Sequence, residues 1–295
     1  MAAPEPQPTN EDHQDDFYLG PRISTQPSPF PAKDFCSSGR HATIQGLSDS
    51  DIPNLWKNLR TPEGDDSVFN YLPQLRQDSP EAFARVLQSL CDEHGMVLYA
   101  IKADPNRLSP SPSSSQCSPT RHTSTLGLIA FLSITPQHRA LEVGAVLYSP
   151  ALQRTTAGTE AAYLLLSYAF GEEPKSPPSP TSSSSSLTTT PTLTSTALSP
   201  RYRRVVWKCN SLNTSSRRAA ERLGFVYEGT LRSHMVFCGR SRDSDFLSML
   251  EGEWEGFVKA GFEAWLDWGN FGDGGGQVLG LGELREREKG RVMGE

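Results

Sequence analysis

Residues 203–232 read RRVVWKCNSLNTSSRRAAERLGFVYEGTLR, and this stretch decides the fold. Val205, Trp207 and Cys209 alternate with more polar positions, which is the pattern of a half-buried strand. The segment TSSRRAAERL predicts a short helix, which Gly224 closes just after its last turn. FVYEGTLR then has the composition of another strand. The stretch therefore predicts a strand, a helix and a second strand in direct succession.

Residues 141–170 contain a comparable strand–loop–helix unit. A strand ends before Pro150, a loop covers 153–159, and a helix begins near Gly158. The first amides of a helix have no partner within the helix, and together with the helix dipole they favour an anion. Arg154 would add a charge-assisted contact. Two interpretations remain open from the residues alone, a phosphate site or an ordinary connection with a threonine cap.

The remaining periodic segments predict an α/β domain built on a mixed sheet. Helices are expected over about 52–59 after Ser48 or Asp49, from Pro80 to Gly95, and over about 253–268. Strands are expected before Leu47, at 96–103, 125–134 and 140–148, and in a final pair after Gly224 whose turn contains Arg242 and Asp243. The expected order is β-α-α-β-β-β-α-β-α-β-β.

Four segments are too poor in apolar residues to offset the entropy of ordering them. They are 1–40, 105–122, 171–200 and the tail 269–295. Ser, Thr and Pro fill most of 171–200. We therefore expect one domain over 41–268, with disordered insertions at 105–122 and 171–200 and flexible ends.

Composition excludes several classes of protein. Lys and Arg number 28 against 34 Asp and Glu, a formal net charge of −6, which argues against a general nucleic-acid binder. No apolar run is long enough for a membrane span, and the acidic N-terminus is not a secretory signal. Five cysteines without a C-x-x-C spacing favour a reducing, cytoplasmic location. Cys91 and His94 lack a second pair of ligands, so we expect no metal site.

The stretch 203–232 and the following GRSRDSDFLSMLEGEW resemble the GCN5-related N-acetyltransferase (GNAT) superfamily. The nearest branch contains the RimJ/RimL-type ribosomal-protein N-terminal acetyltransferases. The matching features are Asn213 with Ser216, Ala219-Ala220, Leu223-Gly224-Phe225, Glu228-Gly229, Arg232, Arg242-Asp243 and the helix start Thr159-Glu160-Ala161. The resemblance implies acetyl-CoA as co-substrate and an amine as acceptor.

The resemblance also implies where acetyl-CoA would bind, in a gap between the strand at 140–148 and the strand at 203–210. Backbone groups of Val146 and Tyr148 would pair with the acetyl carbonyl and the pantetheine. Asn213 and Ser216 would lie beside the pantetheine and the sulfur. The diphosphate would be held by the loop residues Gln153, Arg154, Thr155, Thr156, Ala157, Gly158 and Thr159.

Two departures from the superfamily bear on the chemistry. Thr156 replaces the first glycine of the phosphate loop, so the backbone there must reach its geometry with a Cβ present. Ala220 stands where many members have an acidic tyrosine, and Ser216 becomes the candidate acid for the departing thiolate. Glu142 is the candidate base, because an offset of four should place it on the same sheet face as Val146. The other interpretation of Glu142 is a surface or cross-strand pairing carboxylate.

We therefore expect an N-acetyltransferase in which a primary amine attacks the bound thioester directly. A non-catalytic module that binds acyl-CoA or a protein, and an adaptor with phosphorylated insertions, remain as alternatives. Cys209 is expected to be buried and structural, and Glu160 to serve the helix terminus. The oligomeric state and the identity of the acceptor stay open.

Overall fold

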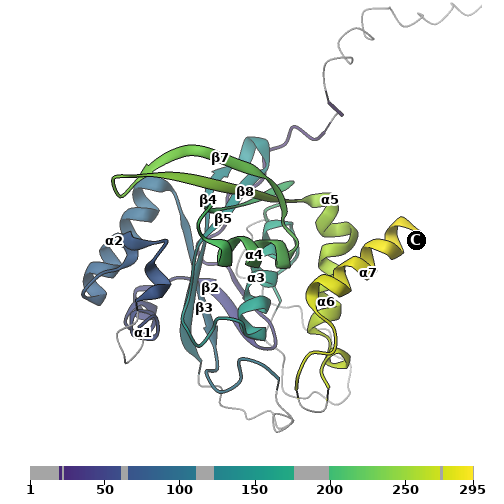
Figure 1. Ribbon diagram of the computed structural model, residues 1–295, viewed down its shortest axis with the longest axis horizontal. Coiled ribbons are helices and arrows are strands. Elements are labelled where there is room, and N and C mark those ends of the chain that lie inside the picture. Colours follow the sequence, from purple (N-terminus) through teal and green to yellow (C-terminus); the bar gives the residue numbers. More distant parts are fainter. Residues whose placement is uncertain are drawn as a thin grey trace, which may run out of the picture.

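The computed structural model describes residues 20–21, 23–60, 66–110, 123–175, 199–272 and 275–294 of the 295-residue chain. They form one mixed sheet with helices on both faces (Figure 1). The strands are β1 (Cys36–Ser38), β2 (Ala42–Gly46), β3 (Val97–Ala103), β4 (Ser124–Thr135), β5 (Ala140–Tyr148), β6 (Arg204–Asn210), β7 (Val226–Phe237) and β8 (Arg240–Leu250). The helices are α1 (Ile52–Asn58), α2 (Pro80–His94), α3 (Thr156–Ala169), α4 (Thr214–Leu223), α5 (Glu251–Glu253), α6 (Lys259–Leu266) and α7 (Leu281–Met293), with a π-helical turn at Trp254–Val258 joining α5 to α6.

The strands lie in the order β1-β2-β3-β4-β5-β6-β8-β7. Neighbouring strands are antiparallel except β5 and β6, which run parallel. A parallel pair needs a crossover connection, and α3 is that connection. The predicted α/β class with a mixed sheet is confirmed, and the predicted order of elements holds from β2 to β8.

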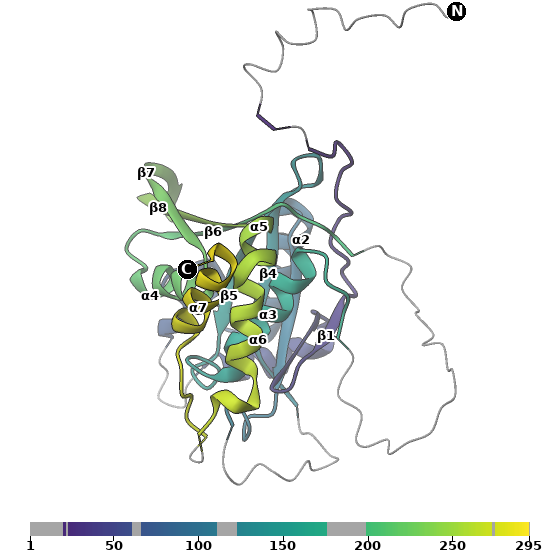
Figure 2. The ribbon, with the colours of Figure 1, turned by 90° about the vertical axis from the view of Figure 1, so that its right-hand side faces the viewer.

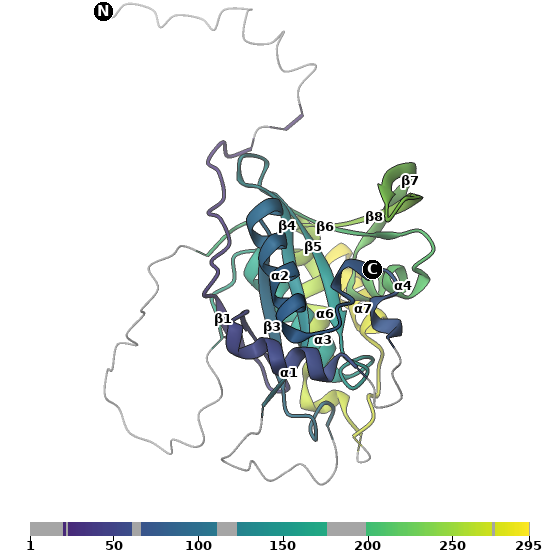
Figure 3. The same ribbon diagram turned by 90° about the vertical axis from the view of Figure 1, so that its left-hand side faces the viewer.

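The helices divide between the two faces of the sheet. Helices α3, α4, α6 and α7 contribute to the larger apolar core on one face (Figure 2). Helices α1 and α2 cover the other face over β3 and β4 (Figure 3). Helix α3 is buried along its whole length, because it lies between the sheet and α6.

Local capping explains where α2 and α4 begin and end. The Ser79 hydroxyl accepts the amide of Ala82 before α2, and Gly95 ends the helix with a left-handed φ of 60°. The Asn213 side chain accepts the amide of Ser216 before α4, and Gly224 ends it with a φ of 108°. Both helices follow the prediction within a residue.

Glu160 anchors α3 to the start of the sheet. Its carboxylate accepts the backbone amides of Arg40, His41 and Ala42 at 2.9, 2.5 and 2.8 Å. A Cβ at Gly39 would lie 2.3 Å from the Glu160 carboxyl carbon, so a side chain there would displace the carboxylate from these amides. Three charge-assisted hydrogen bonds compensate the burial of the carboxylate. Glu160 is structural, as predicted, but it holds the turn before β2 and not the N-terminus of its own helix.

The N-terminal segment corrects the prediction that residues 1–40 are disordered. Within its described part, Phe35 stacks on Tyr168 of α3 with 3.6 Å between ring centroids. The Ala32 amide donates to the Tyr168 hydroxyl, and the Tyr99 hydroxyl donates to the Ala32 carbonyl. Strand β1 extends the sheet beyond β2. The composition misled because one aromatic ring and two tyrosine hydroxyls order a stretch with few aliphatic residues.

The C-terminal segment corrects a second prediction, that of a flexible tail after residue 268. Helix α7 packs on α6 and α4 through buried Leu281 and Leu284. The Arg285 guanidinium donates to the carbonyls of Glu221 and Arg222 at the end of α4. The charged surface of α7 gives the segment its polar composition and conceals the three-residue spacing of the two leucines.

The β7–β8 turn is also displaced from its predicted position. It consists of Cys238 and Gly239, with φ values of 50° and 71°, the backbone of a tight two-residue hairpin turn. Arg242 and Asp243 instead belong to β8, where Arg242 pairs with Met235. The predicted insertions lie largely outside the described residues, which include 105–110, 171–175 and 199–200.

Candidate active site

The two parallel strands at the centre of the sheet diverge. Their pairing joins Ala140–Val143 to Arg204–Trp207 and ends at the Val143–Trp207 pair. Strand β5 continues to Tyr148 and β6 continues to Asn210 without further pairing between them. This is the gap that the resemblance implied, and it opens toward the N-termini of α3 and α4.

A β-bulge in β5 lies at the start of the gap. Ala130 pairs with Gly144 and Leu128 with Leu147, so two residues of β5 oppose one residue of β4. Ala145 adopts a left-handed φ of 47° there. The extra residue reverses the alternation of side chains along the rest of the strand.

The bulge corrects the expected placement of Glu142. Leu141 and Val143 before the bulge, and Val146 after it, all face the core on the α3 side of the sheet. Glu142 therefore points to the opposite face from Val146. A spacing of four residues places Glu142 and Val146 on the same face only in a strand without a bulge.

The edge of β5 that faces the gap presents backbone N–H and C=O groups that are not paired with a neighbouring strand. The Ser149 amide donates to Leu126 on β4, so alternate peptide groups before it point away from β4. By this alternation the Val146 carbonyl and both backbone groups of Tyr148 face the gap, and the Tyr148 carbonyl already accepts the Gln153 side-chain amide there. They are the positions that the resemblance assigned to acetyl and pantetheine contacts.

The loop before α3 is held by its own side chains. Thr155 caps the helix, because its hydroxyl accepts the Gly158 amide and donates to the Leu152 carbonyl. The Gln153 side chain donates to the Tyr148 carbonyl. A Cβ at Gly158 would lie 2.8 Å from the Leu152 carbonyl oxygen, which explains the glycine that the chain retains.

The residue with a left-handed backbone in this loop is Arg154, with a φ of 60°, and not Thr156. Thr156 is the first helical residue of α3. Its Cβ therefore meets no conformational penalty, and the missing glycine does not distort the loop.

The first two amides of α3 already have acceptors. The Thr156 amide donates to the Ser109 hydroxyl at 3.2 Å, and the Ala157 amide donates to the Leu108 carbonyl at 2.8 Å. Both acceptors belong to the short segment that follows β3. No local sequence pattern indicates this contact, because the two segments are almost fifty residues apart.

Arg222 lies beside the same helix terminus. Its guanidinium donates to the Thr159 hydroxyl at 3.1 Å and lies over the Trp265 ring, 5.1 Å from the centroid. Within the described residues no carboxylate lies within 4 Å of it. An exposed cation at the positive end of a helix favours an anionic ligand. Arg217, in contrast, is paired with Glu221 and Asp245.

Tyr148 ties the end of β5 to the start of α3. Its hydroxyl donates to the Gly158 carbonyl at 3.0 Å. Burial raises the pKa of this phenol well above its ordinary value, so it stays protonated at physiological pH. The side chain is structural, and the part of Tyr148 that remains for a ligand is its backbone N–H, because Gln153 already donates to its carbonyl.

Asn213 and Ser216 stand at the N-terminus of α4, where β6 leaves the sheet. The Asn213 side-chain oxygen caps the helix, so its NH₂ group is the part available to a ligand. The Ser216 hydroxyl accepts the Trp207 indole N–H at 3.0 Å. Trp207 was predicted as a buried strand residue, but its hydrogen bond to Ser216 was not.

Cys209 lies next to Ser216 and is buried. Burial raises the pKa of the Cys209 thiol above its ordinary value, and a hydrogen bond from Ser216 opposes that rise in part. A buried thiol of this kind is a poor nucleophile, in agreement with its expected structural role. To donate a proton into the gap, the Ser216 hydroxyl would have to turn away from Cys209.

Glu142 lies at the closed end of the gap on the α1/α2 face. Its carboxylate pairs with the Lys208 ammonium at 3.1 Å and accepts the Ser133 hydroxyl at 3.1 Å. The carboxylate is 7% exposed and the Lys208 side chain 19% exposed. Of the two interpretations left open by the sequence, the structure displays the cross-strand pair, and Lys208 is the partner that the sequence did not reveal.

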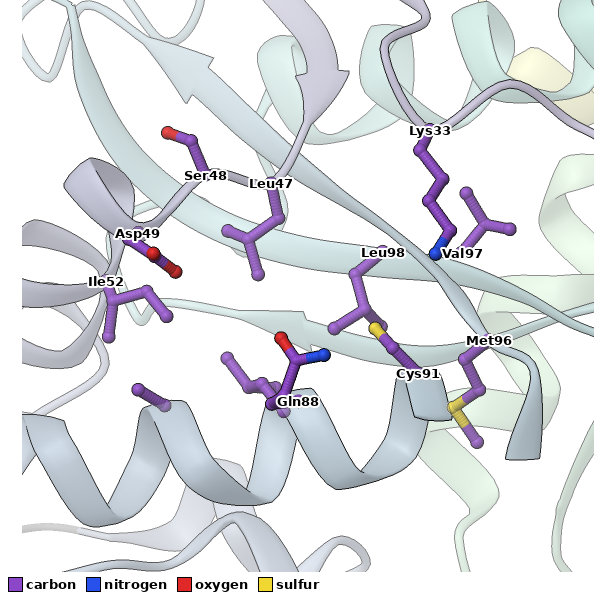
Figure 4. Close-up of a pocket in the computed structure, with 12 residues that line it drawn as sticks. Lys33, Leu47, Ser48, Asp49, Ile52, Gln88, Cys91, Met96, Val97 and Leu98 are labelled. Carbon is purple, nitrogen blue, oxygen red and sulfur yellow. The ribbon is translucent and has the colours of Figure 1, made fainter. Parts of the chain in front are cut away.

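A pocket of about 100 Å³ lies away from the gap, between α2 and β3 (Figure 4). Leu87, Cys91, Val97 and Leu98 line it, and the Lys33 side chain reaches toward it. It is too small for a nucleotide cofactor. Burial raises the pKa of the Cys91 thiol. Across the described residues no group of three or more His, Cys, Asp or Glu side chains is arranged to hold a metal ion.

Comparison with known proteins agrees with this geometry. The chain matches the family model described as an acetyltransferase (GNAT) domain over residues 42–226. A solved GCN5-related N-acetyltransferase from Brucella melitensis is 26% identical, with a TM-score of 0.68, and the match covers 88% of this chain and 98% of that chain. A probable GNAT-family acetyltransferase from Chromobacterium violaceum ATCC 12472 is 28% identical, with a TM-score of 0.58 and coverage of 86% and 100%. The search among curated proteins gave no match.

The parallel strands β5 and β6 diverge toward the N-termini of α3 and α4. This is the site architecture of an acyl-CoA-dependent transferase. The chain belongs to the GNAT acetyltransferase family, and it is an acetyltransferase with acetyl-CoA as its co-substrate. Within the described residues no helix has the length and apolar character to cross a membrane.

Proposed function

We propose that the chain transfers the acetyl group of acetyl-CoA to a primary amine, either a protein N-terminus or a small-molecule amine. The observation that carries the proposal is the gap between β5 and β6, lined by the outward backbone groups of Val146 and Tyr148. We also propose that the enzyme belongs to the RimJ/RimL-type branch, on the residues around Asn213 and Gly224.

The residues around the gap fit acetyl-CoA. The backbone edge of β5 offers alternating donors and acceptors to the amides of a pantetheine arm, and the Asn213 NH₂ group would donate from the other side. The loop from Gln153 to Thr159 and the exposed Arg222 cation suit the diphosphate. When bound, acetyl-CoA supplies an acetyl group already activated as a thioester.

Catalysis in this proposal consists of alignment and charge stabilisation. The gap would hold the thioester next to the incoming amine, which converts a bimolecular encounter into an oriented one. Amide hydrogens on the free edge of β5 would stabilise the negative charge that develops on the acetyl oxygen. No covalent acetyl-enzyme is required.

Two side chains would move protons. Ser216, with its oxygen held by the Trp207 indole, would donate to the departing sulfur after turning from Cys209. Glu142 would accept the amine proton, directly or through water. Helices α3 and α4 cover the face on which the cofactor would enter, so the acceptor would approach from the opposite face, to which Glu142 points.

The charge of the protein suits a cationic acceptor. The formal net charge of −6 would attract an ammonium group before it loses its proton. The four cysteines of the described residues are free thiols. We therefore infer that the enzyme works in a reducing, cytoplasmic environment.

The proposal is tested with purified full-length protein. Isothermal calorimetry should detect acetyl-CoA binding, and a panel of peptides and polyamines with isotope-labelled acetyl-CoA should yield acetylated product by mass spectrometry. Absence of both binding and free-thiol release across the panel would refute the proposal.

A second candidate function is a non-catalytic acyl-CoA-binding or protein-interaction module. Ala220 in place of the usual tyrosine, and the acceptors already bound to the Thr156 and Ala157 amides, favour it. Binding of acetyl-CoA without turnover, unchanged in Ser216→Ala and Glu142→Gln, would select this candidate.

A further inference from the structure

The segment that follows β3 reaches the N-terminus of α3. It begins with a short turn, in which the Arg107 and Asn106 amides bond to the Asp104 carbonyl and carboxylate. Leu108 then packs against the apolar core on the α3 side, while Ser109 is exposed. Both this turn and the start of α3 lie at the lower end of the domain in Figure 1.

The contact uses the amides that a diphosphate would need. Thr156 and Ala157 are the first two residues of α3, and their N–H groups have no acceptor inside the helix. Ser109 and Leu108 supply neutral oxygens to them at 3.2 and 2.8 Å. The third amide, that of Gly158, is taken by the Thr155 cap.

We propose that Leu108 and Ser109 form an autoinhibitory strap, which competes with the diphosphate of acetyl-CoA for the Thr156 and Ala157 amides. The proposal rests on the proposed acetyl-CoA site. The Leu108 carbonyl and a phosphate oxygen cannot occupy the same donor direction, so the strap and the bound diphosphate exclude each other. A phosphate forms charge-assisted hydrogen bonds to these amides, which are stronger than bonds to a hydroxyl or a carbonyl. Acetyl-CoA therefore displaces the strap and does not bind beside it.

Only molecules in which the strap is released can bind the diphosphate. The apparent association constant for acetyl-CoA is therefore the intrinsic constant multiplied by the fraction of such molecules. A ligand without phosphates does not compete with the strap for the Thr156 and Ala157 amides. Pantetheine carries the same arm as CoA without the diphosphate, and it enters the gap while the strap remains bound. This difference between the two ligands separates the strap from a general effect on folding.

The experiment compares calorimetric affinities of acetyl-CoA and pantetheine for the full-length protein and two variants. Leu108→Gly combined with Ser109→Ala removes the apolar anchor and one acceptor. We expect it to bind acetyl-CoA about 10-fold more tightly, with pantetheine affinity unchanged. Asn106→Ala, an exposed side chain on the same turn, is the matched control and should bind both ligands as the wild type does.

Trypsin cleavage after Arg107 provides a second measurement on the unaltered protein. Acetyl-CoA should accelerate this cleavage, because it releases the strap, and pantetheine should not. Equal or weaker acetyl-CoA binding by the double variant, or cleavage that acetyl-CoA leaves unchanged or slows, overturns the strap while leaving acetyl transfer intact. Failure of every variant to bind acetyl-CoA overturns both the strap and the proposed function.

Discussion

At the scale of single residues, the hydrogen bond from Trp207 to Ser216 gives a sharp test of the proposed acid. Trp207→Phe keeps most of the buried ring and removes the indole N–H that fixes the serine oxygen. A neutral hydrogen bond contributes about 1 kcal/mol, so kcat should fall about 5-fold. The KM for acetyl-CoA should change little, because the buried indole offers almost no surface to a ligand.

Trp254→Phe is the matched control for this substitution. Trp254 is equally buried, and its indole N–H has no acceptor among the described residues. Steady-state thiol-release kinetics should show wild-type kcat for it. Equal losses of kcat in both variants would mean that the effect comes from packing and not from Ser216.

Substitutions in the Glu142–Lys208 pair distinguish two roles of the Glu142 carboxylate, catalytic base and ion-pair partner. If Glu142 is the base, Glu142→Gln should lower kcat/KM about 100-fold, the usual range for a lost general base. Lys208→Met leaves the buried carboxylate without its cation, and should cost about 1–3 kcal/mol of unfolding free energy while acetyl transfer persists. Loss of stability in both variants with kcat/KM preserved would assign Glu142 to pairing alone.

Residue positions in the site were predictable only where the backbone is regular. The sequence predicted the extent of α4 and the loop before α3 correctly, because glycines and an expected threonine cap mark them. It misplaced Glu142 relative to Val146, because the strand was treated as regular, although Gly144 beside Ala145 is the kind of residue that marks a bulge. Contacts such as Thr156 with Ser109 join distant segments and leave no local pattern.

At the scale of elements, Asp51 links α1 to the sheet and makes stability depend on pH. Burial acts to raise the pKa of Asp51, but hydrogen bonds from Lys102 and Ser48 outweigh it and hold the pKa below its ordinary value. The folded protein therefore binds this proton less readily than the unfolded chain does. The resulting stability is complete above the ordinary carboxyl pKa of about 3.9 and is lost as the pH falls through the lower folded value.

Asp51→Asn should therefore lower the unfolding free energy by about 1–2 kcal/mol at pH 7. The difference from the wild type should shrink below about pH 4, where the carboxyl of the unfolded chain becomes protonated, and should be lost below the lower pKa of the native carboxyl. Urea unfolding at a series of pH values measures both quantities. A difference that stays constant down to pH 3 would show that charge on Asp51 contributes nothing.

Elements were predictable where one periodicity is unbroken. Strands β3 to β6 and helices α2 and α4 match their expected ranges within one or two residues, because apolar spacing and end signals agree. Strand β1 was missed because three residues are too few to show alternation. Helix α7 was missed because Leu281 and Leu284 are its only buried side chains among many charges.

At the scale of the whole molecule, the C-terminal helices support α4, the helix that carries Asn213 and Ser216 at its first turn. The family match ends at residue 226, so α5, α6 and α7 lie beyond it. Helix α7 crosses α6 closely, since a Cβ at Gly261 would lie 2.9 Å from the Arg285 Cα. From this crossing Arg285 donates to the last carbonyls of α4, whose first turn carries Asn213 and Ser216. One end of α4 is thus held by α7, and the other faces the gap.

Arg285→Met should therefore affect binding as well as stability. The substitution keeps an apolar stem over Gly224 and removes two hydrogen bonds to α4 carbonyls, at an expected cost of about 1–2 kcal/mol in unfolding free energy. Since α4 is then less well fixed, acetyl-CoA affinity should fall about 3-fold at a temperature where the variant remains fully folded. Arg291→Met is the control on the same helix, because the exposed Arg291 side chain pairs with Glu288 of α7 and not with α4. Calorimetry and thermal unfolding on both variants distinguish the outcomes: a stability loss with unchanged affinity would make Arg285 a support of the fold alone, whereas a loss of both would show that the C-terminal helix maintains the cofactor site through α4.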